Sequence, residues 1–226
     1  MWNATYQAGS GRKPGALGRG SGTTPSLLGD DFLAIADNHD DQINLLIYSQ
    51  HASGQDVEPI CTLPLFQRYR SWTDNGPMVH YDGKDYSVVM MNMNHQAAFE
   101  YNHEDINGAY NNFTTMSPGI SKFFVAGDGS GCHAEWTNPS RMTTVPVLST
   151  ATGLIYGYEQ SKELANRGEY VWYASAIDYE SGRTVWKART GAGGIFNNYL
   201  RTTFLGPHGT MYQMVQGGVV IIKDGE

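Results

Sequence analysis

The clearest hydrophobic pattern in the chain covers residues 170–178. Side chains with a period of two form one set, Val171, Tyr173, Ser175 and Ile177, and the residues between them form the other, Trp172, Ala174, Ala176 and Asp178. This period predicts a β-strand, because successive side chains of a strand point to opposite faces. Residues 179–182, Tyr-Glu-Ser-Gly, then predict a tight turn, since Gly182 tolerates a positive φ. A second stretch with β-branched residues and Trp186 follows at 183–188. The whole segment therefore predicts a β-hairpin.

Short strand patterns separated by turn residues recur along the chain. We group them into four antiparallel repeats of up to four strands, at 23–66, 75–138, 143–190 and 199–225. The last repeat has three strands, at 200–206, 209–215 and 217–225. Residues 1–22 are predicted as an orphan outer strand (1–9) followed by a Gly-rich linker without packing residues. The repeats predict an all-β chain of 226 residues that forms one domain, or the C-terminal part of one.

Several motifs resemble the quinoprotein-like (PQQ-like repeat) β-propellers, and more narrowly a poorly characterised, mostly secreted bacterial group. They are GSGTTPSLLGDDFLAIADN, TATGLIYGY, AIDYESGRTVWK and NNYLRTTFLGPHGTMY. The resemblance implies a β-propeller of four-stranded blades, about four of them in this chain, and an extracellular or periplasmic location. It also implies that Trp186 packs between neighbouring blades. Three architectures remain open: a four-bladed ring closed by strand 1–9, a homodimer sharing an eight-bladed ring, or part of a larger propeller.

Composition excludes several classes of function. Charged residues make up 16% of the chain and the net charge is −7, so no basic patch is expected to bind nucleic acid. No apolar run approaches the roughly 20 residues of a membrane span. The N-terminus lacks the basic start and apolar core of a signal peptide. Cys61 and Cys132 cannot form a zinc site alone, and whether they pair as a disulfide stays open.

Candidate ligand-binding residues follow from the blade pattern. In a propeller, the connections between outer and inner strands (D–A) and between the second and third strands (B–C) share one face, where the central channel opens. The polar residues predicted to bind a ligand there are Thr24, Asn75, Asn92, Arg141, Asn197, Asn198 and Tyr199. Several aromatic residues are predicted either to line a carbohydrate or aromatic-ligand cleft or to pack in the core, namely Tyr86, Tyr101, Tyr110, Phe113 and Tyr199.

A metal site is the second candidate. Closure of the ring could bring a set of oxygen ligands suited to Ca²⁺ around one axis: Asp37, Asn75, Asn92 and Asn198. Asp37 or Asp74 would then act as a base, and His95 as a base or metal ligand. The alternative is that these polar groups only satisfy backbone donors at strand ends. The same choice applies to the Asp37-x-His39-x-Asp41 segment, which has the alternate spacing of a calcium loop.

Three functions remain after these considerations. The favoured one is a non-catalytic propeller that binds a small molecule or protein partner at its channel face. The alternative is a calcium-assisted hydrolase or lactonase of the propeller type, and oxidoreductase chemistry is a third option. The family's quinone-binding enzymes carry adjacent cysteines, which this chain lacks, so PQQ is not expected. The serine-hydrolase elbow Gly-x-Ser-x-Gly is also absent from the sequence.

Overall fold

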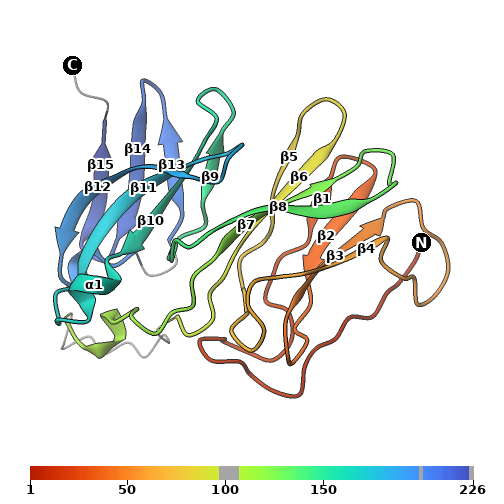
Figure 1. Cartoon of the computed structure of the whole chain (residues 1–226), viewed down its shortest axis with the longest axis horizontal. Helices are drawn as coiled ribbons and strands as arrows, with labels where there is room; N and C mark the ends of the chain where they lie inside the picture. Colours follow the sequence, from red (N-terminus) through yellow and green to blue (C-terminus); the bar gives the residue numbers. More distant parts are fainter. Residues whose placement is uncertain (97–106, 199–200, 224–226) are drawn as a thin grey trace. The chain divides into compact units, whose positions relative to one another are not determined.

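The computed structural model describes residues 1–96, 107–198 and 201–223, and its strands form four antiparallel sheets (Figure 1). Each sheet is a meander in which strands that follow one another in sequence lie side by side. Blade one consists of β1 (Ser26–Leu28), β2 (Phe32–Ala36), β3 (Asn44–Ser49) and β4 (Cys61–Pro64). Blade two consists of β5 (Met78–Tyr81), β6 (Tyr86–Met91), β7 (Ile120–Val125) and β8 (Cys132–Asn138).

The remaining strands form two further sheets. Blade three consists of β9 (Val147–Ser149), β10 (Leu154–Gln160), β11 (Val171–Asp178) and β12 (Thr184–Ala192). Blade four has three strands in the described residues, β13 (Thr203–Gly206), β14 (Thr210–Val215) and β15 (Gly218–Ile222). The short helical elements are η1 (Ala109–Asn111), α1 (Lys162–Ala165) and η2 (Gly194–Phe196). Within the described ranges no helix is long and apolar enough to cross a membrane.

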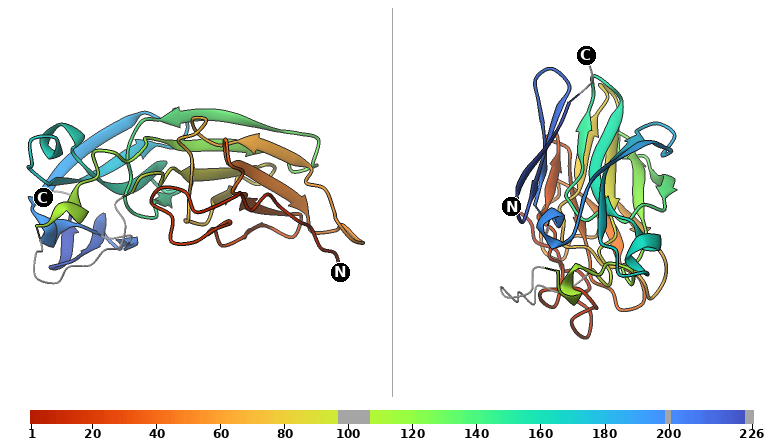
Figure 2. Two further views of the ribbon diagram at one scale, coloured as in Figure 1. Left: turned by 90° about the horizontal axis from the view of Figure 1, so that it is seen from below. Right: turned by 90° about the vertical axis from the view of Figure 1, so that its left-hand side faces the viewer.

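These sheets confirm the predicted fold class, an all-β chain of four-stranded antiparallel blades. The predicted hairpin is the pair β11–β12, which Figure 2 shows in two further views. Gly182 has a φ of 68° in its turn, as the sequence predicts. The two alternating sets of β11 side chains point to opposite faces of the sheet, and both faces are covered. Trp172 from one set and Ile177 from the other are therefore buried.

The N-terminal residues differ from their prediction. Residues 1–9 form no strand of a sheet, only a single parallel bridge between Trp2 and Gly54. Asn3 donates its N–H to Gly54 O at 3.3 Å and accepts from Val57 N–H at 2.9 Å. Trp2 also stacks on Tyr48 with ring centroids 5.6 Å apart. This segment is therefore held on blade one by backbone and side-chain hydrogen bonds and by an aromatic contact.

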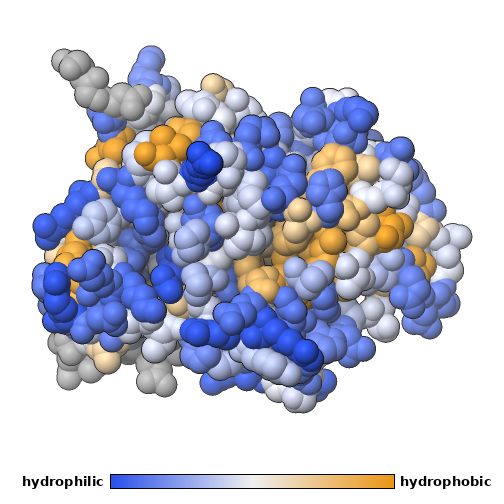
Figure 3. Space-filling model, in the orientation of Figure 1, coloured by the Kyte–Doolittle hydropathy of each residue, from blue (hydrophilic) through white to orange (hydrophobic). Residues whose placement is uncertain are grey.

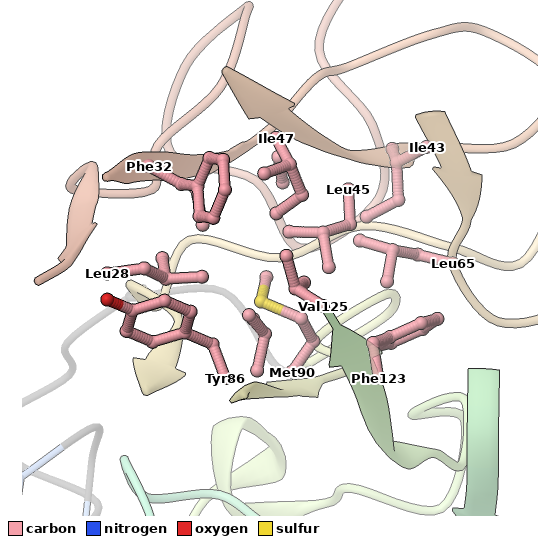
Figure 4. Close-up of a cluster of buried hydrophobic side chains, with 13 residues drawn as sticks. Leu28, Phe32, Ile43, Leu45, Ile47, Leu65, Tyr86, Met90, Phe123 and Val125 are labelled. Atoms are coloured by element: carbon pink, nitrogen blue, oxygen red, sulfur yellow. The ribbon is translucent and has the colours of Figure 1, made fainter. Parts of the chain in front are cut away.

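The chain divides into two compact units. Unit 1 contains Met1–Asn94 and Gly119–Thr137, and unit 2 contains His95–Pro118 and Asn138–Glu226. In unit 1, blades one and two bury a shared core of apolar side chains, among them Phe32, Ile47 and Phe123 (Figure 4). Cys61 of β4 and Cys132 of β8 form a disulfide, with Cα atoms 6.2 Å apart. The cysteines thus link the outer strands of these two blades.

The core of unit 2 is built around Trp172 of β11. Its ring stacks on Tyr158 at a centroid distance of 5.8 Å and meets Phe113 edge-on at 5.5 Å. Met211 and Val215 of blade four belong to the same cluster, and Trp186 packs against it. Trp186 therefore lies between blades three and four, as the family resemblance implies.

Candidate functional site

Asp37, predicted as a metal ligand or base, lies just after β2 in unit 1 and is buried. Its Oδ1 accepts hydrogen bonds from Asn44 N–H at 2.7 Å and from His39 N–H at 3.2 Å. Its Oδ2 accepts from Asn44 Nδ2 at 2.8 Å. The carboxylate therefore ties the end of β2 to the start of β3. This matches the alternative in which the polar group satisfies backbone donors at a strand end.

Asn92 has a comparable role after β6. Its Oδ1 accepts from Asn94 N–H at 3.1 Å and from Trp72 N–H at 3.3 Å, while its Nδ2 donates to Arg70 O at 2.8 Å. Asn75 Nδ2 lies 2.8 Å from the sulfur of Met91. Each of these amides is committed to neighbours within unit 1.

The acidic residues after Asp37 also point to separate partners. Ser10 donates to Asp40 from both its backbone and its hydroxyl, and these bonds lower the pKa of Asp40. Arg68 donates to Asp41 and lowers the pKa of that carboxyl. Among residues 1–96, 107–198 and 201–223, no three His, Cys, Asp or Glu side chains are grouped to hold a metal ion. Calcium binding by the predicted Asp/Asn set stays a prediction.

Asp74 differs from the other predicted acids. It is half-buried, and desolvation raises the pKa of its carboxyl. No hydrogen bond or ion pair to this carboxylate occurs within the described ranges. The side chain lies over the backbone of Gly22, where an added Cβ would overlap it. Thr24, two residues after Gly22 and also predicted to bind a ligand, is exposed.

The Gly-rich segment 10–22 is not the unpacked linker that the sequence predicts. Lys13 reaches across the ends of the blade-one strands and donates to His39 O at 2.5 Å and Ser71 O at 3.3 Å. Burial lowers the pKa of this ammonium group, although Asp37 lies near it. Ala16 is buried as well. The prediction failed because these contacts depend on one long side chain and leave no periodic pattern in the sequence.

In unit 2, the predicted residues of the fourth D–A connection are also bonded to neighbours. Asn198 accepts from Thr143 Oγ1 at 2.6 Å and donates to Thr143 O at 2.7 Å. Asn197 donates from Nδ2 to Asn111 Oδ1 at 2.8 Å. His95 is exposed with a φ of 59°. Tyr199 lies outside the described residues.

The aromatic residues predicted as cleft or core divide as follows. Tyr86 and Phe113 are core residues, the first in unit 1 and the second in unit 2. Tyr110 lies within η1, and Tyr101 lies outside the described residues. Neither Tyr86 nor Phe113 is thus available to line a cleft.

Arg141, one of the predicted ligand-binding residues, lines a pocket. We call this hollow of about 360 Å³ the blade-three pocket. It lies where the D–A connection at 138–141 and the B–C connection at 160–163 meet β11 and β12. Its lining residues include Ser140, Arg141, Glu159, Lys162, Tyr173 and Lys187. The surface over α1, beside it, is mostly hydrophilic (Figure 3).

An ion pair lies among the lining residues of the blade-three pocket. Glu159 of β10 and Lys187 of β12 approach to 3.0 Å, with 7% and 44% of their side chains exposed. Both strands flank β11, where Glu159 pairs with Tyr173 and Lys187 pairs with Ser175 in the sheet register. The two ions therefore meet across β11 over Ser175, whose small side chain leaves room between them.

The walls of the pocket are fixed by hydrogen bonds. Asn138 donates to Gly182 O at 2.7 Å and accepts from Ser140 N–H at 2.8 Å. Gln160 donates to Asn111 O at 2.6 Å, and Arg141 Nε donates to Met116 O at 2.8 Å. These bonds hold the two connections in place, so the pocket is formed before any ligand arrives.

Sequence reasoning identified the end of the blade and Arg141, but it missed Glu159, Lys187 and Tyr173. Glu159 ends the run of strand residues predicted at 153–159. Its charge at a predicted strand end was the sequence signal that could have identified it as a site residue. Lys187 lies in the predicted second strand of the hairpin. Its position opposite Glu159 depends on the register of three strands.

Comparison with known proteins identifies no function. No family model matches the chain. It is 26% identical to an uncharacterised protein of Archaeoglobus fulgidus, over 96% of this chain and 44% of that protein. A structure from Bacteroides uniformis, named as a candidate 6-phosphogluconolactonase, is similar with 13% identity and a TM-score of 0.44, over 96% of this chain and 55% of that one. The structure of BamB from Moraxella catarrhalis is similar with 8% identity and a TM-score of 0.40, over 88% of this chain and 57% of that one. The chain spans about half the length of these proteins.

Proposed function

We propose that this chain is a binding module of the propeller type, which takes a small polar ligand or the polar side chain of a protein partner in the blade-three pocket. The observation that carries the proposal is a preformed hollow of about 360 Å³ with a buried carboxylate, Glu159, in its lining. Pockets of this size suit small ligands, and a few placed polar groups give them specificity. The pocket also lies at the end of the blade where ligands of propellers are expected.

The hydrogen-bonded walls support binding. A site whose loops are already ordered loses little conformational entropy when a ligand enters, so more of the contact energy appears as affinity. Gln160 illustrates this, because its amide bonds both Phe113 N–H and Asn111 O and cannot turn freely. Its role is to hold the B–C connection.

A steric variant tests the proposal. Thr184→Trp places a large ring on a residue that lines the pocket, whereas Val185→Trp adds the same ring to the next residue of β12, which is exposed and does not line it. Saturation-transfer NMR with a mixed panel of neutral, acidic and amine-bearing small molecules reports binding. We expect binding to wild type and to Val185→Trp, and its loss in Thr184→Trp. Equal binding by all three proteins, or by none, contradicts the proposal.

A calcium-assisted hydrolase is the second candidate, and Asp74 is the observation that favours it. A half-buried carboxylate with a raised pKa and no partner in the described ranges has the properties of a general base. Calcium titration by calorimetry, followed by hydrolysis assays on γ-lactones, tests this candidate. It requires stoichiometric calcium binding and turnover that Asp74→Asn abolishes. An ion-free protein without lactonase activity rules it out.

The disulfide supports a further part of the proposal, that the chain works outside the cytosol. Disulfides persist in oxidising compartments and are rare where thiols are kept reduced. Cys61–Cys132 joins two blades of unit 1, so its formation accompanies folding of that unit. Alkylation of unfolded protein purified from the native host provides the test: free thiols at both positions would contradict an extracellular or periplasmic location.

A further inference from the structure

The acceptor capacity of Glu159 indicates what kind of group the blade-three pocket binds, and this inference rests on the proposed function. Glu159 is 6% exposed, and its Oε1 has no hydrogen-bond donor of suitable geometry within the described part of the chain. The Nζ of Lys187 lies 3.0 Å from this same oxygen and forms an ion pair with it. An ionised carboxylate offers about four acceptor sites, so Glu159 has sites left over. A buried acceptor of this kind favours a ligand that brings an O–H or N–H donor.

The charges around the pocket argue against a charged ligand. Its lining contains three cationic residues, Arg141, Lys162 and Lys187, and two acidic ones, Glu159 and Glu163. An ammonium ligand at Glu159 would lie beside the Lys187 ammonium group, which already neutralises that carboxylate. An anionic ligand at Lys187 would lie beside Glu159. A neutral group escapes both repulsions.

Hydroxyl groups meet both requirements, because each one donates and accepts. One hydroxyl can donate to Glu159, and a neighbouring one can accept from Lys187, which has further N–H donors besides the one facing Glu159. Tyr173 is the direct cross-strand neighbour of Glu159 and lines the same pocket. Its ring provides an apolar surface beside the polar pair, and C–H groups of a sugar ring pack well on such a surface.

We propose that the blade-three pocket binds a neutral carbohydrate, with hydroxyls on the Glu159–Lys187 pair and a sugar face on Tyr173. Glu159 acts as the acceptor that selects hydroxyl donors. Lys187 neutralises it and donates to the ligand. Tyr173 selects the ring.

Calorimetry and saturation-transfer NMR with defined sugars test this proposal. The probes are the neutral disaccharides maltose, cellobiose and lactose, with glucuronic acid and glucosamine as charged counterparts. We expect a neutral disaccharide to bind wild type at least tenfold more tightly than either charged sugar. Glu159→Gln and Tyr173→Leu are each expected to weaken that binding at least tenfold. The control is Glu135→Gln, which removes the carboxylate of another ion pair, with Lys122 at 3.2 Å in unit 1, away from the blade-three pocket.

The outcomes separate the two proposals. Preferential binding of glucuronic acid or glucosamine that Thr184→Trp abolishes would overturn the inference of a neutral carbohydrate and keep the blade-three pocket as a binding site. Neutral sugar binding that Glu159→Gln leaves unchanged would also overturn the inference. Absence of any probe binding sensitive to Thr184→Trp overturns both. Circular dichroism confirms that each variant is folded, and Lys187→Met serves as a second test of the ion pair if Glu159→Gln is not.

Discussion

The disulfide between Cys61 and Cys132 allows a quantitative test of how unit 1 is held together. It closes a loop between residues 71 positions apart and joins the outer strands of two blades. Cross-linking restricts the unfolded chain, and the chain-entropy model gives about 3 kcal/mol for a 15-residue loop and about 4.7 kcal/mol for a 100-residue loop. Interpolation for this loop gives about 4 kcal/mol at 25 °C. Removal of the disulfide should therefore lower the stability of unit 1 by about that amount.

Native-state hydrogen exchange resolves this effect by segment. The double variant Cys61→Ala/Cys132→Ala is compared with the oxidised wild type, and amide protection is measured for β3 and β7 in unit 1 and for β11 in unit 2. We expect the opening free energies of β3 and β7 to fall by about 4 kcal/mol while those of β11 stay unchanged. Wild type in reductant is the control and should behave like the variant.

Two results would refute this reasoning. A loss below about 1 kcal/mol in β3 and β7 would show that loop closure is not what the disulfide contributes. An equal loss in β11 would show that its effect is not confined to unit 1. The cysteines also contact the core of blades one and two, so a small packing loss is expected in both the variant and the reduced protein.

Three further predictions concern single positions. Gly127→Ala should destabilise unit 1 by about 1–3 kcal/mol in urea unfolding, because the added Cβ would overlap the backbone carbonyl of Lys84, and a neutral result would contradict this. Asp74 has a raised pKa in the folded protein, so its stabilising effect is present below its unfolded pKa and is lost as pH rises through the folded one. Asp74→Asn should therefore have a higher Tm than wild type at pH 7 and an equal Tm at pH 3. A lower Tm of the variant at pH 7 would show that the ionised carboxylate stabilises the fold, which contradicts the prediction. Tyr86 donates its hydroxyl to Asp31 at 2.8 Å, and this bond with burial raises the pKa of Tyr86 to about 12. Ultraviolet titration of Asp31→Asn should show one tyrosine ionising at lower pH than in wild type, and an unchanged titration would exclude the bond as the cause.

The fold was largely predictable because it depends on local patterns. Strand alternation and turn glycines are both visible within about ten residues, and together they predicted the hairpin β11–β12 and the order of strands in each blade. The N-terminal segment was not predictable in the same way. Trp2 could equally have begun an outer strand, and only its bridge to Gly54 and its contact with Tyr48, both distant in sequence, assign it to blade one.

The candidate site was less predictable, since it depends on contacts between distant residues. The polar residues at strand ends, such as Asp37 and Asn92, were expected either to bind ligands or to satisfy backbone donors. In the structure they do the second, because a strand end leaves N–H groups that a short carboxylate or amide side chain reaches. Whether such a residue also meets a metal depends on the spacing of several loops, which no local pattern contains.

The Glu159–Lys187 pair shows why the lining of a pocket is harder to predict than its place. The two residues belong to strands that are not neighbours, and they meet only because the register sets them on the same face of β11. A one-residue shift of β12 would turn Lys187 to the opposite face and leave a buried carboxylate unpaired, which is strongly unfavourable. The pair therefore stabilises the register that creates the pocket. The contacts that fix the fold of blade three at this end are thus the same contacts that we propose a sugar uses.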